Sequence, residues 1–310
     1  MREIAVFGGR AHPALAAEIC ACLSEPQLPV RFTRFANDCI EVQMQSNCRE
    51  RDVFLIQPLV PPVQENLFEL LLMADAARGA SAARVTAVMP HYAYARSDKK
   101  DEPRISIAAR LVADLLVTAG VNRVLTLTLH SPQVHGFFAV PVDHLQALRE
   151  LAAYFRRRDL SHAVVVSPDL GYAKSAAAFA RRLGLPVAAG SKERFSDSHV
   201  SISAIIGDVA GRDVIVLDDE IARGTTVFEL LDRLREQEVR SVAVACTHGL
   251  FADNALDKLA ASDVTEIVCT NSAPLQTEHP KLTILSVAPA LAEAISRIHN
   301  GESVSSLFDH

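Results

Sequence analysis

The stretch "VIVLDDEIARGTT" (Val214–Thr226) contains residue types that can bind a phosphorylated sugar. An apolar run leads into two adjacent carboxylates, Asp218 and Asp219, and then into the small-residue turn Gly224-Thr225-Thr226, after which a helical pattern begins. Backbone N–H groups at the start of a helix bind phosphate, and carboxylates accept hydrogen bonds from sugar hydroxyls. We therefore expect the carboxylates to contact the sugar and the turn to hold its phosphate.

Arg223 stands directly before this turn and admits several roles. Its guanidinium can face the phosphate, because an arginine makes strong charge-assisted hydrogen bonds with anions. It can also turn back onto Asp218, Asp219 or Glu220, or point outward into solvent.

Two further apolar runs end at residues suited to a metal or phosphate site. His130 follows "LTLTL" and Asp169 follows "VVVSP". A carboxylate in such a place suits Mg²⁺, a hard cation that takes oxygen ligands and shares them with substrate phosphates. Asp169 can instead cap the following helix, and a lone histidine is often structural. We expect both residues at the ligand-binding edge of a sheet.

Two charged segments have open interpretations. The basic cluster "YARSDKKDEPR" (Tyr94–Arg104) is either a clamp on a polyphosphate, through arginine's planar fork, or a solvated loop. The polar segment "GSKERFSDSHV" (Gly190–Val200) is either a mobile lid or a surface hairpin.

The elements that position these residues alternate along the whole chain. Short apolar runs such as "IAVF", "DVFLIQ" and "HAVVVS" are separated by helical patterns, and the alternation occurs twice, with a joint near Val140–Glu150. Apolar strands separated by helices predict a parallel sheet covered on both faces. We therefore expect an α/β fold of two doubly wound parallel-sheet domains related by duplication, 1–145 and 146–310. In such sheets ligands bind at the carboxyl ends of the strands.

The composition excludes several classes of protein. The 310 residues are 49% hydrophobic and 22% charged, as in soluble globular proteins. The net charge of −6 argues against a nucleic-acid partner, and no apolar run is long enough to span a membrane. The start "MREIAVFGGR" is typical of a strand rather than a signal peptide. The six cysteines match no zinc pattern. We expect a cytoplasmic protein with reduced thiols.

Longer motifs accompany these residues: "DVFLIQPLVPPVQENLFELLLMADAAR", "YARSDKK", "LHSPQVHGFFAVPVD", "VVVSPDLGYAK", "IIGDVAGRDVIVLDD", "ACTHGLF" and "SVAPALAEAISRIHNGESVSSLF". With them the chain resembles, nearly end to end, the ribose-phosphate pyrophosphokinases, also called phosphoribosyl-diphosphate synthetases. The resemblance implies two phosphoribosyltransferase-type domains. It also implies transfer of the diphosphoryl group of ATP to the C1 hydroxyl of ribose 5-phosphate, with Mg²⁺ as cofactor and AMP as the second product. Family members are homo-oligomers in which dimers build hexamers.

The resemblance also implies roles for individual residues, carried over by position. Lys192, Arg194 and His130 would be catalytic, the first two closing over the transferring group. His130 and Asp169 would contact Mg²⁺. The nucleotide would be bound by Phe35, Asn37, Cys39, Arg96, Ser97, Asp98 and His130. Ribose 5-phosphate would be bound by Asp218, Asp219, Ala222, Arg223, Gly224, Thr225 and Thr226.

The chain departs from the family at several of these positions. Thr128, Ala139 and Ala222 stand where acids are usual around the metal and sugar. Elsewhere, Asn37 and Cys39 replace acids, Ser97 replaces Gln, Tyr172 replaces Gly and Ser175 replaces Arg. Two alternatives therefore stay open: a diphosphokinase for a related phosphosugar or another nucleotide donor, and a non-catalytic regulatory homologue. The retained Lys192 and Arg194 argue against the second alternative.

Overall fold

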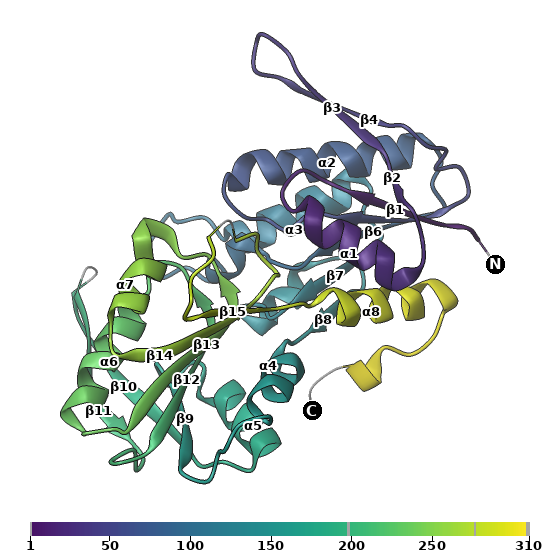
Figure 1. Ribbon diagram of the computed structural model, residues 1–310. Helices are drawn as coiled ribbons and strands as arrows, with labels where there is room; N and C mark the ends of the chain where they lie inside the picture. Colours follow the sequence, from purple (N-terminus) through teal and green to yellow (C-terminus); the bar gives the residue numbers. More distant parts are fainter. Residues whose placement is uncertain (1, 197–198, 276, 308–310) are drawn as a thin grey trace. The chain divides into compact units, whose positions relative to one another are not determined.

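A computed structural model describes residues 2–196, 199–275 and 277–307, and the side chains of residues 192–201 lie outside that description. The chain forms two compact units (Figure 1). Among the described residues, the first unit comprises 2–146, 272–274 and 287–307, and the second comprises 147–196, 199–271, 275 and 277–286.

The first unit contains a six-stranded parallel sheet in the order β2-β1-β5-β6-β7-β8. Its strands are β1 (Ile4–Gly8), β2 (Gln27–Leu28), β5 (Asp52–Ile56), β6 (Arg84–Met89), β7 (Arg123–Leu127) and β8 (Val142–Leu145). The helices are α1 (Pro13–Leu23), α2 (Val63–Gly79), α3 (Ala108–Ala119) and α8 (Ala288–Asn300), with short 3₁₀ turns η1 (Ala93–Arg96), η2 (Pro132–Phe137) and η4 (Ser305–Leu307). Apolar side chains of α2 and α3 pack with strand residues such as Phe7 and Leu55, which forms the core on one face of the sheet.

A separate antiparallel hairpin, β3 (Val30–Arg34) and β4 (Ile40–Met44), follows β2. Figure 1 shows this hairpin extending away from the sheet of the first unit. Apolar side chains at its base, including Val30, Phe32 and Val42, pack against the core beneath α2. The hairpin is therefore held at its base, while its turn is exposed.

The second unit contains a seven-stranded sheet in the order β11-β10-β9-β12-β13-β14-β15, parallel except for the β10–β11 pair. Its strands are β9 (Ala163–Ser167), β10 (Val187–Ser196), β11 (His199–Ile206), β12 (Asp213–Ile221), β13 (Ser241–Gly249), β14 (Val264–Thr270) and β15 (Leu282–Leu285). The helices are α4 (Leu148–Phe155), α5 (Ala173–Leu183), α6 (Thr225–Glu236) and α7 (Ala255–Ala261), with the 3₁₀ turn η3 (Ala252–Asn254).

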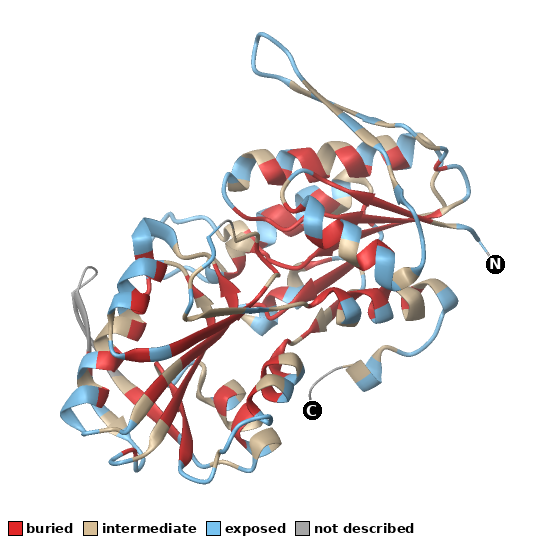
Figure 2. Ribbon diagram, viewed as in Figure 1, coloured by how far each residue is buried: buried red, intermediate tan, exposed pale blue. Residues whose placement is uncertain are grey.

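Helices cover both faces of the second sheet. α4 and α5 pack with Val165 and Leu217 on one face, and α6 and α7 pack with Val216 and Val244 on the other. Figure 2 shows the central strands of both units as buried, as expected for apolar parallel strands. The predicted α/β fold with covered, mostly parallel sheets is confirmed.

The last helix and the segment Gly190–Val200 bear on the predicted boundaries. The last helix, α8, is grouped with the first unit because it packs along α1, so the units differ at their C-terminal ends from the predicted division into 1–145 and 146–310. That division stays a prediction. Of the segment Gly190–Val200, residues 190–196 and 199–200 belong to the paired strands β10 and β11, which extend the second sheet at its edge. Among the described residues, no helix is both long and apolar enough to cross a bilayer.

Candidate active site

The paired carboxylates lie at the carboxyl edge of the second sheet. β12 continues through Asp218 and Asp219, and its neighbours are β9 on one side and β13 on the other. Asp169 follows β9, so all three carboxylates lie at the same edge, and the charge of Asp169 acts on Asp218. The expectation that these acids lie at the carboxyl edge of the sheet is confirmed within this unit, and their binding roles stay predictions.

The carboxylate pair is electrostatically unfavourable by itself. Asp219 is buried, and its backbone N–H donates to Asp218 Oδ1 at 2.9 Å. Burial raises the pKa of Asp218 well above its ordinary value, and the negative charge of Asp219 raises it further. Two close, buried carboxylates need hydrogen-bond donors or a cation to stay ionised. Sugar hydroxyls are donors of this kind.

The turn after β12 presents an uncapped helix start. Gly224 precedes α6 with φ +74°, in the left-handed region, and no side chain caps the helix. A Cβ at Gly224 would lie 3.0 Å from the Phe228 ring, so glycine suits both the conformation and the space. The first-turn N–H groups of α6 have no partner within their own helix, and together with the helix dipole they form an anion-binding site.

Arg223 forms an ion pair with Asp253, a partner that the sequence did not indicate. Its Nε lies 2.7 Å from Asp253 Oδ2, in the η3 turn after β13, and both side chains are largely exposed. Arg223 is thus directed outward onto a partner from the neighbouring loop.

Asp169 organises the loop in which it lies. Its Oδ1 accepts the backbone N–H of Tyr172 at 3.1 Å, and its carbonyl accepts from the hydroxyl of Ser167 at 2.6 Å. One oxygen of Asp169 therefore holds the backbone of Tyr172, the residue directly before α5. This contact resembles the helix-capping role that the sequence left open for Asp169. Burial raises the pKa of the Tyr172 phenol well above its ordinary value, and the charges of Asp219 and Asp218 raise it further. Tyr172 therefore lies within electrostatic reach of the carboxylate pair.

In the first unit, His130 follows a turn that is held at two points. β7 ends at Leu127 rather than continuing to Leu129, because Thr128 has φ +43°, outside the β region. Thr128 N donates to Leu145 O at 2.8 Å, and Leu129 N donates to His144 Nε2 at 2.8 Å. β8 thereby fixes the turn that presents His130, whose side chain is exposed.

His144 is a residue that the sequence reasoning missed. Burial, and then the nearby His135, lower its pKa to about 4. A neutral imidazole can accept the Leu129 N–H, whereas a protonated one cannot. No local sequence signal distinguishes this histidine, since its partner is fifteen residues away in the chain.

The residues after β6 lie at the same sheet edge as His130, because β6 and β7 are parallel neighbours. Ser97 Oγ accepts from Ala108 N and donates to Ser106 O, each at 3.2 Å, so Ser97 closes its loop onto the start of α3. Asp98 Oδ2 accepts from Gln133 Nε2 at 2.7 Å. The loop that contains Arg96, Ser97 and Asp98 is thus tied to the loop after His130.

The predicted base-reading residues form the turn of the β3–β4 hairpin. Phe35 is 48% exposed, and its N–H donates to Cys39 O at 2.9 Å. Asn37 Oδ1 accepts from Cys39 N at 3.2 Å, so this amide oxygen already has a backbone partner. Asp38 has φ +69°.

The predicted lid residues are described only through their backbone. Lys192 pairs with Ile202 and Arg194 with Val200 across the β10–β11 hairpin, with irregular register beside both. Their side chains lie outside the described part of the chain.

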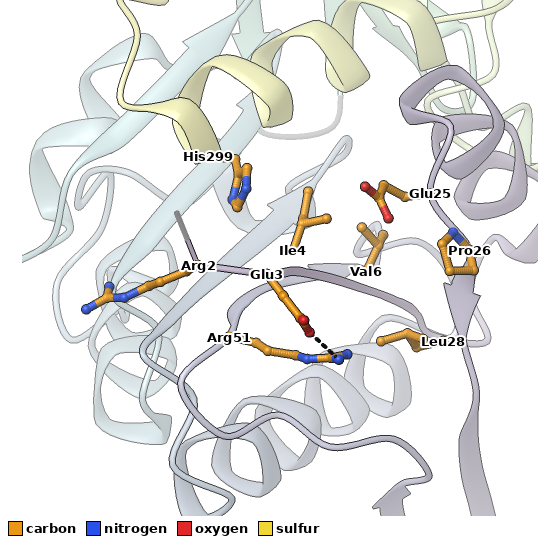
Figure 3. A pocket seen from close by; sticks show the side chains of 9 residues that line it. All are labelled: Arg2, Glu3, Ile4, Val6, Glu25, Pro26, Leu28, Arg51 and His299. Atoms are coloured by element: carbon orange, nitrogen blue, oxygen red, sulfur yellow. Dashed lines mark hydrogen bonds and ion pairs between the residues drawn. The ribbon is translucent and has the colours of Figure 1, made fainter.

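Two cavities lie at the amino ends of the strands, on the side of each sheet opposite to the predicted site residues. One of about 340 Å³ is lined by Ile4, Arg51 and His299, at the amino ends of β1 and β5 (Figure 3). Another of about 430 Å³ is lined by Asp213 and Ser241, where β12 and β13 begin. Neither includes a predicted site residue. In the part of the chain that the structure describes, no group of three or more His, Cys, Asp or Glu side chains could by itself hold a metal.

Comparisons with known proteins match both halves of the chain. Residues 4–120 match the family model described as the N-terminal domain of ribose phosphate pyrophosphokinase, and residues 193–309 match the phosphoribosyl synthetase-associated domain. A Streptomyces coelicolor protein, provisionally named ribose-phosphate pyrophosphokinase, is 71% identical over 100% of this chain and 98% of its own length. The ribose-phosphate pyrophosphokinase of Deinococcus radiodurans is 48% identical over 98% of this chain and 97% of its own length.

A solved structure is similar across the whole fold. The crystal structure of phosphoribosylpyrophosphate synthetase from Mycobacterium smegmatis superposes with a TM-score of 0.92 at 38% identity, covering 97% of this chain and 100% of that one. The resemblance inferred from the sequence is thereby confirmed: the chain belongs to the ribose-phosphate pyrophosphokinase family of enzymes.

Proposed function

We propose that this chain transfers the diphosphoryl group of ATP to the C1 hydroxyl of ribose 5-phosphate, forming phosphoribosyl diphosphate and AMP. Family membership over the full length supports this reaction. The observation that carries it is the arrangement at the end of β12, where a carboxylate pair, the half-buried Asp218 and the buried Asp219, precedes an uncapped helix start. That arrangement matches a ligand with hydroxyls at one end and a phosphate at the other.

Ribose 5-phosphate binds at this edge of the second unit. Asp218 and Asp219 accept hydrogen bonds from the ribose hydroxyls, which relieves the repulsion that raises the pKa of Asp218. Gly224, Thr225 and Thr226 bind the 5-phosphate through backbone N–H groups and hydroxyls. Ala222 and Arg223 complete the turn, and Arg223 reaches the phosphate by exchanging its partner Asp253 for that anion.

ATP is bound by residues of the first unit. Arg96 and His130 contact its phosphates, and the loop tied together by Asp98 and Gln133 keeps them at one edge of the sheet. Ser97 supports that loop through its contacts at the start of α3. Phe35, Asn37 and Cys39 contact the base from the hairpin turn.

Mg²⁺ is the cofactor that the family implies, and a carboxylate such as that of Asp169 is a ligand that suits it. Mg²⁺ is usually held by one or two protein groups together with substrate phosphates and water, so it needs no cluster of three protein ligands, and the described residues contain none. His130 and Asp169 are the contacts that we propose. Bound Mg²⁺ would neutralise charge on the transferring diphosphoryl group.

Transfer itself depends on positioning and on positive charge. The C1 hydroxyl oxygen attacks the β-phosphorus of ATP, the bond from that phosphorus to the AMP oxygen breaks, and the hydroxyl proton is released. Lys192 and Arg194 stabilise the negative charge on the transferring group. Because the family is oligomeric, we propose that this chain assembles into homo-oligomers, with dimers building hexamers.

The test is to incubate the purified protein with ATP, Mg²⁺ and ribose 5-phosphate and to identify the products. AMP together with a diphosphate ester in the phosphorus NMR spectrum supports the proposal. ADP and a single added phosphate contradict it, and so does the absence of any product.

A further inference from the structure

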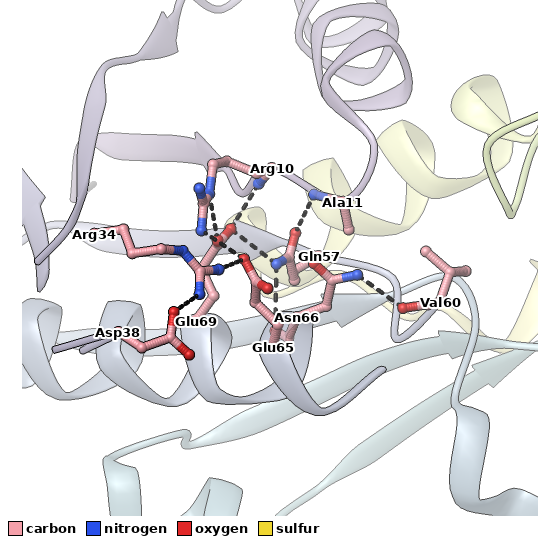
Figure 4. A network of polar contacts seen from close by, with 9 residues as sticks. All are labelled: Arg10, Ala11, Arg34, Asp38, Gln57, Val60, Glu65, Asn66 and Glu69. Carbon is pink, nitrogen blue, oxygen red and sulfur yellow. Dashed lines mark hydrogen bonds and ion pairs between the residues drawn. The ribbon is translucent and has the colours of Figure 1, made fainter. Parts of the chain in front are cut away.

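A chain of polar contacts joins the interior of the first unit to the turn of the β3–β4 hairpin (Figure 4). Its inner end is Glu69 of α2, whose side chain is completely buried. Glu69 accepts from Arg10 N and Arg10 Nε, each at 2.7 Å, and from Gln57 Nε2 at 2.9 Å. A buried carboxylate with three donors is well satisfied and rigidly held. Arg10 is thus fixed by the core through both its backbone and its side chain.

The backbone of the loop after β1 lies close to the side chain of Gln57, which also contacts Glu69. Gln57 is buried and its Oε1 accepts from Ala11 N at 3.0 Å. A Cβ on Gly9 would lie 2.3 Å from the same Oε1, so a larger residue there would displace the Gln57 side chain from its contacts.

The outer end reaches the hairpin through Glu65, one helical turn before Glu69 on the same face of α2. Glu65 Oε1 pairs with Arg10 Nη2 at 3.2 Å and also with Arg34 Nη2. Arg34 is the last residue of β3, and its Nη1 lies 2.5 Å from Asp38 Oδ1 in the hairpin turn. The guanidinium carbon of Arg10 also lies 5.2 Å from the centroid of the Phe32 ring in β3.

We propose that Arg34 and Glu65 are positioning residues that hold the turn Phe35–Cys39 in its base-binding conformation. This inference rests on the proposed function, in which the turn contacts the base of ATP. An isolated exposed ion pair contributes little. Here the Arg34–Glu65 pair is linked through Arg10 to a buried carboxylate, so its side chains are already ordered and the turn is preorganised. Preorganisation strengthens binding because less conformational freedom is lost when the ligand arrives.

The expected consequence is a selective effect on the nucleotide. Without the link, the turn becomes less ordered and ATP binds more weakly, while ribose 5-phosphate, which binds to the other unit, is unaffected. KM for ATP should rise while kcat stays constant, because the contacts between the turn and the base stabilise bound ATP equally in the ground state and in the transition state.

The test variant is Glu65→Gln, which preserves the shape of the side chain and removes its charge. Glu41→Gln is the matched control: Glu41 lies on the same hairpin and pairs with Arg31 at 3.7 Å, with both side chains exposed and neither in the chain of contacts. Glu65→Gln should raise KM for ATP about three- to tenfold, and Glu41→Gln should leave it unchanged. Both variants should keep the wild-type kcat and KM for ribose 5-phosphate. Combining Glu65→Gln with Arg34→Gln should add little to the effect of either change alone.

Amide hydrogen exchange gives a readout that does not depend on catalysis. Exchange in the turn Phe35–Cys39 should be faster in Glu65→Gln than in Glu41→Gln. Equal KM for ATP and equal exchange in the two variants overturn the inference. A wild-type protein that forms no AMP refutes the proposed function instead. In that case the exchange rates and the equilibrium Kd for ATP, compared between the two variants, decide this inference separately.

Discussion

Arg223 and Asp253 form an ion pair, with 2.7 Å between Nε and Oδ2, that joins the loop after β12 to the loop after β13. Asp253 has φ +53° within the η3 turn, and Phe251 just before the turn and Asn254 at its end also have positive φ. The pair engages the one cation of the segment Asp218–Thr226, directly before the helix start that we propose as the phosphate site. Asp253 therefore competes with the sugar phosphate for Arg223.

This competition predicts opposite effects for two substitutions. Asp253→Asn releases Arg223 and should lower KM for ribose 5-phosphate about two- to threefold, with a larger effect at low salt, because the added attraction is electrostatic. Arg223→Thr should raise the same KM. Asp263→Asn is the control, since Asp263, between α7 and β14, pairs at 3.0 Å with Arg235 near the C-terminal end of α6, and both side chains are exposed. If Asp253→Asn and Asp263→Asn behave alike in steady-state kinetics, Arg223 has no influence on the phosphate.

Gly224→Ala should affect both stability and binding. A side chain at φ +74° is strained, and its Cβ would lie 3.0 Å from the Phe228 ring at the start of α6. We expect a loss of about 1–2 kcal/mol in the free energy of unfolding and an increase of roughly tenfold in KM for ribose 5-phosphate.

Gly211→Ala separates these two effects. Gly211 has φ +64° but no heavy atom within 4 Å of an added Cβ. An alanine there should therefore strain the backbone to a similar extent without touching the proposed site. Urea denaturation should show a comparable loss of stability in both variants. An unchanged KM in Gly224→Ala would mean that the turn does not hold the phosphate.

His144 should make stability depend on pH. Its pKa is lowered from 6.5 to about 4, first by burial and then by His135, so the folded state binds fewer protons than the unfolded state between these pH values. The stabilising contribution is complete above pH 6.5 and is lost as the pH falls toward 4, by up to about 3 kcal/mol. Urea denaturation at several pH values measures it. His144→Gln, which can still accept from Leu129 N, should reduce this dependence, whereas a change at the exposed His162 should preserve it.

The lid residues should affect turnover rather than sugar affinity. Lys192→Ala and Arg194→Ala should each lower kcat by on the order of 10²-fold while KM for ribose 5-phosphate stays nearly constant, because their charges act mainly in the transition state. Glu193→Ala on the same strand is the control. Normal turnover in both lysine and arginine variants would identify β10–β11 as an ordinary surface hairpin.

The sequence by itself determined the fold class and the family, and it predicted the residues of the candidate site. Apolar runs such as "VIVL" and "VVVS" require burial on both faces, so helices had to cover the sheets. Because parallel strands end at one edge, the positions of Asp169, Asp218 and Asp219 after such runs already indicated that they lie together. The glycine turn before α6 was also recognisable, since local conformation depends on neighbouring residues.

Only the tertiary structure decided which distant side chains meet. Arg223 pairs with Asp253 because β12 and β13 are neighbours in the sheet. His144 holds the turn before His130 because β7 and β8 are neighbours. The contact of Arg10 with Glu69 joins residues that are 59 positions apart. Such contacts depend on strand order, register and packing around a buried core, and no local pattern of residues encodes them, because each partner alone is only a charged or polar side chain.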